Sequence, residues 1–138
     1  MAFWLMRSEP NVYGWDDLVR DCGTEWDGVR NYTARNFLKD MAAGDRALFY
    51  HSNKEKAAVG VMKITRTWQA DGAEGKWASV RVEPREKLRQ PVTLTAIKSE
   101  PRLARLEMLR QSRLSVTPVR EEEWAILLEM GGLEPPTL

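Results

Sequence analysis

The sequence contains one cysteine, Cys22, and one histidine, His51. A single cysteine cannot form an internal disulfide, and one cysteine with one histidine excludes a zinc site built from these two residue types. No apolar run approaches the roughly 20 residues of a membrane helix, and the start lacks the basic and long apolar segments of a secretory signal. We expect a cytoplasmic protein, or a nuclear one in a eukaryote, with no metal, cofactor or membrane partner.

A large excess of charge is also missing, because 21 Lys and Arg residues face 20 Asp and Glu residues, for a net charge of +1. This balance argues against a protein that clamps duplex DNA along many phosphates. The cations are unevenly spread, however, since five cations and only two glutamates lie between Lys98 and Arg113. Such a patch suits salt-sensitive contact with a few phosphates, or it is a solvated face.

The length of 138 residues and the hydrophobic fraction of 43% are typical of a single globular domain. Hydrophobic periodicity predicts helices over residues 15–21 and 121–130, and a third helix that follows Asn31 as its N-cap. Strands are expected over residues 2–7, 45–52, 57–68 and 76–82, with a charged connector between Pro84 and Pro91, broken helix over 94–109 and a short extended segment over 112–116. This pattern predicts an α+β fold in which short helices surround a small curved or closed sheet.

The most informative stretch is the block from Trp26 to Asn36, which gathers aromatic, amide and arginine side chains around one glycine. Aromatic rings offer a stacking face to a flat heterocycle, and amide groups can read the edge of a base. We interpret the block as one wall of a nucleobase pocket with Trp26 as its stacking surface. With six tryptophans in the chain, most must be structural, and we expect Trp4, Trp68, Trp77 and Trp124 in the core.

Three further clusters of polar and aromatic residues lie where a predicted strand ends or a helix begins: residues 7–10, 50–53 and 112–115. Such ends are where ligand sites tend to be found. We therefore predict that these clusters and the Trp26 block converge on one concave slot for a flat ring.

Two other functions remain open at this stage. In an enzyme that acts on nucleic acid, His51 could serve as general base with Ser8, Ser52 or Ser115 as its partner. However, the sequence has no Gly-x-Ser-x-Gly elbow, P-loop or dinucleotide fingerprint. In an adaptor domain, the cavity would hold a small molecule or nothing. We favour binding without catalysis and assign no catalytic residue.

In this order, the four clusters resemble the EVE domain family over nearly all of residues 1–132, and we expect residues 133–138 to form a flexible tail. The strongest marks of the resemblance are residues 26–32 and 112–116. The family usually starts with Lys-Ser-Glu-Pro, and Arg7 replaces that lysine, which keeps the cation but changes its geometry. The resemblance implies a PUA-like fold, a small curved β-barrel surrounded by short helices.

The EVE family is similar to the YTH domains, which hold a methylated adenine in an aromatic cage. The resemblance therefore implies a reader that binds DNA or RNA carrying a modified base. The residues expected to contact the nucleobase are Ser8, Trp26, Asn31, Tyr32, Tyr50, His51, Ser52 and Leu114. Those expected at the pocket mouth or on a phosphate are Arg7, Arg30, Arg35, Arg113 and Ser115.

Overall fold

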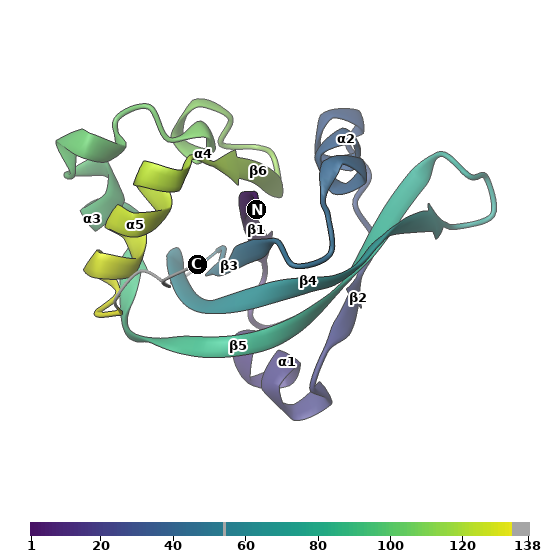
Figure 1. Ribbon diagram of the computed structural model, residues 1–138, viewed down its shortest axis with the longest axis horizontal. Helices are drawn as coiled ribbons and strands as arrows, with labels where there is room; N and C mark the ends of the chain where they lie inside the picture. Colours follow the sequence, from purple (N-terminus) through teal and green to yellow (C-terminus); the bar gives the residue numbers. More distant parts are fainter. Residues whose placement is uncertain (54, 134–138) are drawn as a thin grey trace.

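The computed structural model describes residues 1–53 and 55–133 (Figure 1). The elements follow in the order β1 (Phe3–Ser8), α1 (Trp15–Asp21), β2 (Thr24–Trp26), α2 (Tyr32–Asp40), β3 (Arg46–His51), β4 (Ala57–Asp71), β5 (Trp77–Thr93), α3 (Leu94–Lys98), the 3-10 helix η1 (Pro101–Leu103), α4 (Glu107–Arg110), β6 (Val116–Val119) and α5 (Glu121–Met130). Within these residues, no helix is long and apolar enough to cross a bilayer.

The strands form one six-stranded sheet in the order β2-β5-β4-β3-β1-β6. β1 and β3 run parallel, whereas every other neighbouring pair is antiparallel. The predicted α+β fold, with a curved sheet and short helices around it, is confirmed. The expected barrel is left open, because β2 and β6 stand at the two edges of the sheet without pairing to each other in the described part of the chain.

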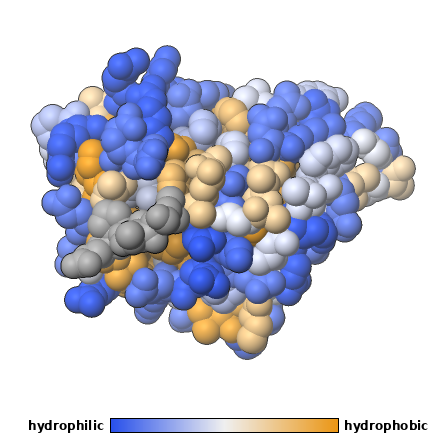
Figure 2. Space-filling view, in the orientation of Figure 1, coloured by the Kyte–Doolittle hydropathy of each residue, from blue (hydrophilic) through white to orange (hydrophobic). Residues whose placement is uncertain are grey.

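Both faces of the sheet are covered, which explains why β1 and β3 are apolar without alternation. Trp4, Met6 and Phe49 belong to the core that α1 and α2 complete on one face. Phe3 and Leu48 belong to a second core, which α3, α4 and α5 complete on the other face (Figure 1). Figure 2 shows the consequence on the outside, where hydrophilic residues cover most of one view. Polar side chains of these two strands are therefore found at their ends.

The helices begin where the sequence predicts. Asn31 caps α2, with its side-chain oxygen accepting a hydrogen bond from the Ala34 amide at 3.0 Å. α5 begins after Arg120, whose amide donates to the Glu123 carboxylate at 2.9 Å. That bond replaces the missing side-chain cap.

Two predictions about strands are wrong. β5 runs straight through the segment between Pro84 and Pro91 that was expected to be a connector. The register between β4 and β5 shifts between Val61 and Met62, which pairs with Pro84, and shifts again over the stretch that contains Pro91, so bulges accommodate both prolines. The last strand is also displaced, since β6 starts at Val116 instead of ending there.

The end of the described chain packs against the protein body. Leu133, the first residue of the expected tail, packs against the second core, and its amide donates to the Leu128 carbonyl at 2.9 Å. Residues 134–138, the rest of the expected tail, lie outside the described residues.

Asp45 ties the start of β1 to the start of β3. The residue is 3% exposed, and its carboxylate accepts hydrogen bonds from the Ala2 amide at 3.0 Å, the Trp4 indole at 3.0 Å and the Ala42 amide at 2.9 Å. A buried carboxylate with three donors is satisfied, whereas removing it would leave those donors without a partner.

We predict that Asp45→Ala lowers the free energy of unfolding by about 3 kcal/mol, because each orphaned buried donor costs roughly 1–3 kcal/mol. Urea denaturation followed by circular dichroism measures the change. The matched control is Asp40→Ala, at an exposed position, which should change stability by less than about 0.5 kcal/mol. Equal effects of the two substitutions would contradict the assigned role of Asp45.

Candidate functional site

A cavity of about 470 Å³ opens where β1 ends and β2 leads into the loop before α2. Its lining comes from four separate segments: Arg7 and Ser8; Val12 and Tyr13; residues 24–30; and Ser115. The size is within the usual range for small-molecule sites. The cavity therefore collects the ends of elements that are far apart in the sequence.

Trp26 joins this cavity to the core. The residue is only 8% exposed, and its indole packs edge-on against Phe49, with ring centroids 5.5 Å apart and planes at 81°. The residue nevertheless lines the cavity. Core packing thus holds the indole in one position, which is what a stacking wall requires.

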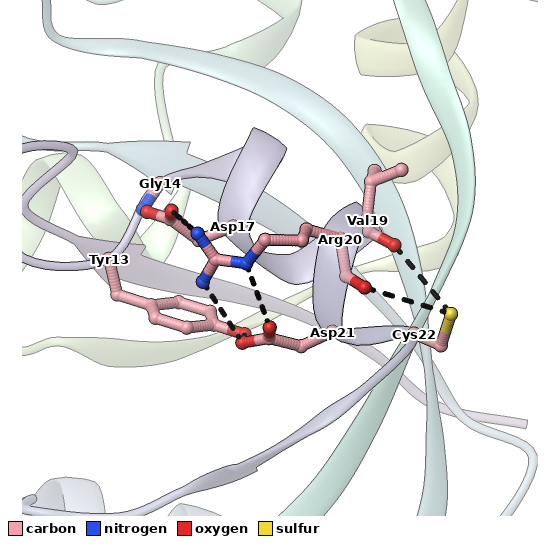
Figure 3. Close-up of polar contacts among 7 residues, drawn as sticks. All are labelled: Tyr13, Gly14, Asp17, Val19, Arg20, Asp21 and Cys22. Carbon is pink, nitrogen blue, oxygen red and sulfur yellow. Dashed lines mark hydrogen bonds and ion pairs between the residues drawn. The ribbon is translucent and has the colours of Figure 1, made fainter.

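Tyr13 forms a second aromatic part of the lining, and α1 positions it (Figure 3). Its hydroxyl donates to Asp21 at 2.9 Å, and Asp21 is held in turn by Arg20 at 3.0 Å. Burial raises the pKa of Tyr13, and the hydrogen bond to Asp21 raises it further. The phenol therefore stays protonated and fixed by this bond.

The polar groups that remain available in the cavity include acceptors. The Ser8 hydroxyl donates to the Tyr13 carbonyl at 2.6 Å, so towards a ligand its oxygen can only accept. Asp27 is exposed and adds a carboxylate to the lining. The neighbouring Glu25 is occupied, because Arg66 donates to both of its oxygens at 2.6 and 2.7 Å.

Arg7 separates this cavity from a second one of about 450 Å³. Its guanidinium donates to the carbonyl oxygens of Ser112 and Met108 and lies 5.6 Å from the centre of the Tyr50 ring. Burial lowers the pKa of Arg7 and raises that of Tyr50. The second cavity is also lined by Lys56 and Lys98 and has no carboxylate in its described lining, which makes it suited to anions.

The structure brings only part of the predicted site together. Arg7, Ser8, Trp26, Arg30 and Ser115 line the first cavity. Tyr50 and Ser52 line the second cavity instead. Six of the expected site residues line neither cavity: Asn31, Tyr32, Arg35, His51, Arg113 and Leu114.

Each of these displaced residues has another environment. Asn31 uses its side chain to cap α2. Tyr32 is stacked on Trp77, and Arg35 lies over the Tyr32 ring. In the last cluster, Leu114 is buried at 7% exposure, whereas Arg113 is exposed. The residue composition of each cluster does not determine where these side chains lie in the fold.

The His51 side chain forms hydrogen bonds that stabilise the fold. Its Nε2 accepts a hydrogen bond from the Trp15 amide at 3.1 Å, and its Nδ1 lies 2.9 Å from the Glu55 carboxylate. Nε2 must be unprotonated to accept, so Nδ1 carries the proton towards Glu55. Both ring nitrogens therefore hold α1 and the loop after β3, and the ring lies outside the cavity lining.

The predicted site residues left out seven lining residues: Val12, Tyr13, Thr24, Glu25, Asp27, Gly28 and Val29. Asp27 lies within the block that was singled out, so its position next to Trp26 was a usable signal. Val12 and Tyr13 lie between the cluster of residues 7–10 and the predicted helix over residues 15–21, and neither was singled out from the sequence. Only the fold shows that α1 brings them beside Trp26.

Comparison with known proteins decides the family. The EVE domain model matches residues 2–130, which is nearly the whole described chain. The protein is an EVE domain.

Solved structures resemble this EVE domain closely. A protein from Agrobacterium tumefaciens is 39% identical and has a TM-score of 0.94, with 99% of this chain and 97% of that one covered. Human Thymocyte nuclear protein 1 is 32% identical over 97% of this chain and 76% of its own length. Its structure in complex with DNA containing 5-methylcytosine has a TM-score of 0.88 and covers 98% of this chain and 100% of that one.

The expected relation to YTH domains is confirmed at the level of the fold. The YTH domain of a Zygosaccharomyces rouxii protein, solved with N6-methyladenosine RNA, has a TM-score of 0.58 over 99% of this chain and 88% of that one. The sequence identity is 14%, so the likeness concerns the architecture of this EVE domain.

We predict a pH-dependent contribution of Glu25 to stability. Hydrogen bonds from Arg66 lower the pKa of Glu25. The ion pair therefore stabilises the fold at pH values above the usual pKa of a glutamate, and this stabilisation is lost as the pH falls through the lowered pKa. Glu25→Gln should reduce the free energy of unfolding at neutral pH, and its difference from wild type should narrow towards about pH 3.

Urea unfolding curves at both pH values measure this difference. Glu86→Gln provides the control, because Glu86 is exposed on β5 and should show little difference from wild type at either pH. A deficit of Glu25→Gln that stays constant with pH would contradict the ion-pair explanation.

Proposed function

We propose that this EVE domain is a reader that takes one modified nucleobase of a DNA or RNA strand into the cavity beside Trp26. The observation that carries the proposal is the position of Trp26, which core packing fixes while its residue lines an open cavity. A flat base stacked on such a wall gains roughly 1–3 kcal/mol. Arg7 and Arg30 add positive charge to the lining for the adjoining phosphates.

A relative with bound DNA supports the same reading. The human Thymocyte nuclear protein 1 structure, which is 32% identical over 98% of this chain, is a complex with DNA that contains 5-methylcytosine. A base inside a duplex must leave the stack before it can enter a pocket, and unstacking costs a few kcal/mol. The flanking phosphates would meet Arg7 and the cations of the second cavity, Lys56 and Lys98.

The available acceptors favour a base with an exocyclic amino group, such as a cytosine or adenine derivative. The Ser8 oxygen and the Asp27 carboxylate can accept from that amino group, whereas a keto oxygen at the same place would face two acceptors. A methyl group would fill space beside the apolar Val12 and Val29 in the lining. One methyl in an apolar slot is worth about 1–3 kcal/mol.

Binding without chemistry fits the residues that are available. The enzyme hypothesis depended on His51 as general base, but that ring is engaged by the Trp15 amide and by Glu55. A general base must reach the proton that it abstracts, directly or through one water. The proposal therefore assigns no catalytic role to any residue of the cavity.

We predict that Trp26→Ala weakens binding to an oligonucleotide with one 5-methylcytosine by about 10-fold and reduces its preference over the unmodified oligonucleotide. Fluorescence anisotropy titrations measure both quantities. Because Trp26 also packs on Phe49, thermal unfolding checks that the variant is folded. Trp26→Phe, which keeps an aromatic wall, should recover most of the affinity. Wild-type preference in a folded Trp26→Ala protein would refute the assignment.

We further predict that 5-methylcytosine binds more tightly than thymine at the same position of the oligonucleotide. The two bases carry the same ring methyl group but differ in the amino or keto group beside it and in the neighbouring ring nitrogen, which accepts a hydrogen bond in 5-methylcytosine and donates one in thymine. Competition titrations should show this preference, and Asp27→Ala should reduce it several-fold by removing an acceptor. Equal affinity for the two bases would contradict recognition of the amino group.

A further inference from the structure

A stack of four side chains begins at the cavity and lies between the start of α2 and the β4–β5 hairpin. The Arg30 guanidinium lies 5.4 Å from the centre of the Trp77 ring. Trp77 stacks on Tyr32, with centroids 5.0 Å apart and planes at 27°. Arg35 covers the far side of this pair, 4.8 Å from the centre of the Tyr32 ring. We call these residues the Arg30–Arg35 stack.

The stack is on the surface and carries positive charge. Tyr32 is 56% exposed, although it is a large aromatic side chain. Arg35 donates to neutral oxygens, those of the Asn36 side chain and the Lys76 carbonyl, and forms no ion pair within the described residues. Arg30 forms an ion pair with Asp71 through one of its nitrogens, at 2.9 Å. Exposed aromatic groups that are capped by arginines are typical of surfaces that meet nucleic acid.

The expectation that Trp68 and Trp77 belong to the core is therefore wrong. Trp77 is partly exposed within the stack, and Trp68, at 41% exposure, carries the Lys39 ammonium 4.5 Å from its ring centre. Both tryptophans belong to the same hairpin, and both are covered by cations. Packing in a hydrophobic core does not explain why this solvent-exposed hairpin carries two of the six tryptophans.

The stack is continuous with the cavity. Arg30 lines the cavity and is also the first layer of the stack. Asp71 of the hairpin fixes this junction, because it accepts hydrogen bonds from both the Arg30 guanidinium and the Gly28 amide at 2.9 Å. Figure 1 shows the hairpin extending beyond the rest of the sheet beside α2. A strand that leaves the cavity past Arg30 would meet Tyr32 and Arg35 next.

We propose that the Arg30–Arg35 stack is a second nucleic-acid contact, which holds the nucleotides that flank the bound base on the Arg30 side of the cavity. The two rings hold the planar guanidinium groups in position, so that their free N–H groups can donate to phosphate oxygens and the outer Arg35 plane can carry an unpaired base. This contact reads no base edge, so it adds affinity without selectivity for the modification. The inference rests on the proposed function.

The test compares affinity with selectivity. Single-stranded oligonucleotides with and without a central 5-methylcytosine are titrated against the variants between about 50 and 200 mM salt. Tyr32→Ala and Arg35→Ala should each weaken binding to both oligonucleotides by about 10-fold and leave the ratio of the two affinities unchanged. Arg35→Ala should also reduce the slope of log affinity against log salt by about 0.7, the loss of one phosphate contact on a single strand.

Two control variants sharpen the result. Tyr32→Phe keeps the ring and should bind as wild type does. Lys87→Ala removes an exposed cation ten residues along β5 from Trp77 and should change neither affinity nor salt slope. The inference is contradicted if Tyr32→Ala and Arg35→Ala bind nucleic acid as Lys87→Ala does. It is also contradicted if Tyr32→Ala lowers the melting temperature without changing the affinity, because the stack then only stabilises the fold.

The outcome also separates the two proposals. Loss of selectivity in Trp26→Ala with unchanged binding in Arg35→Ala supports the cavity and overturns the stack. Loss of affinity in Arg35→Ala with no effect of Trp26→Ala supports the stack as a nucleic-acid surface and overturns the proposed base site.

Discussion

The parallel pairing of β1 with β3 is the constraint on which the rest of the structure depends. In this pairing Ser8 stands beside His51, and the Ser52 amide donates to the Ser8 carbonyl at 2.9 Å. Parallel strands end at the same edge of a sheet, so residues 7–8 and 50–52 meet there although about forty positions separate them. The buried Asp45 fixes the opposite end of the pair through three hydrogen bonds. Both cavities open at the edge that this arrangement defines.

Coverage of both faces of the sheet explains why the site lies at strand ends. The side chains of the central strands pack into two hydrophobic cores, one under α1 and α2 and the other under α3, α4 and α5. Polar groups can therefore project only where a strand leaves this packing. Trp26 is at such a point, since it is the last residue of a three-residue strand. The same residue can be part of the core and of the cavity wall without conflict.

Elements determined by local sequence were predictable, whereas those determined by distant pairing were not. The apolar spacing of residues 15–21 and 121–130 located α1 and α5, and Asn31 was correctly identified as a cap. The prolines of β5 suggested a break because the bulges that accommodate them depend on pairing with β4. For the site, residue types pointed to Trp26 and Ser8. They could not show that Arg7 divides two cavities or that Tyr13 is brought in by α1.

The open sheet has a consequence for self-association. Unpaired strand edges are templates on which another chain can add a strand and start aggregation. Here one edge strand, β2, has three residues, and the other, β6, has four and includes Pro118, which lacks an amide hydrogen. Each of these two strands offers few consecutive backbone groups for pairing. Neither terminal strand of the open sheet is therefore a long template for strand addition.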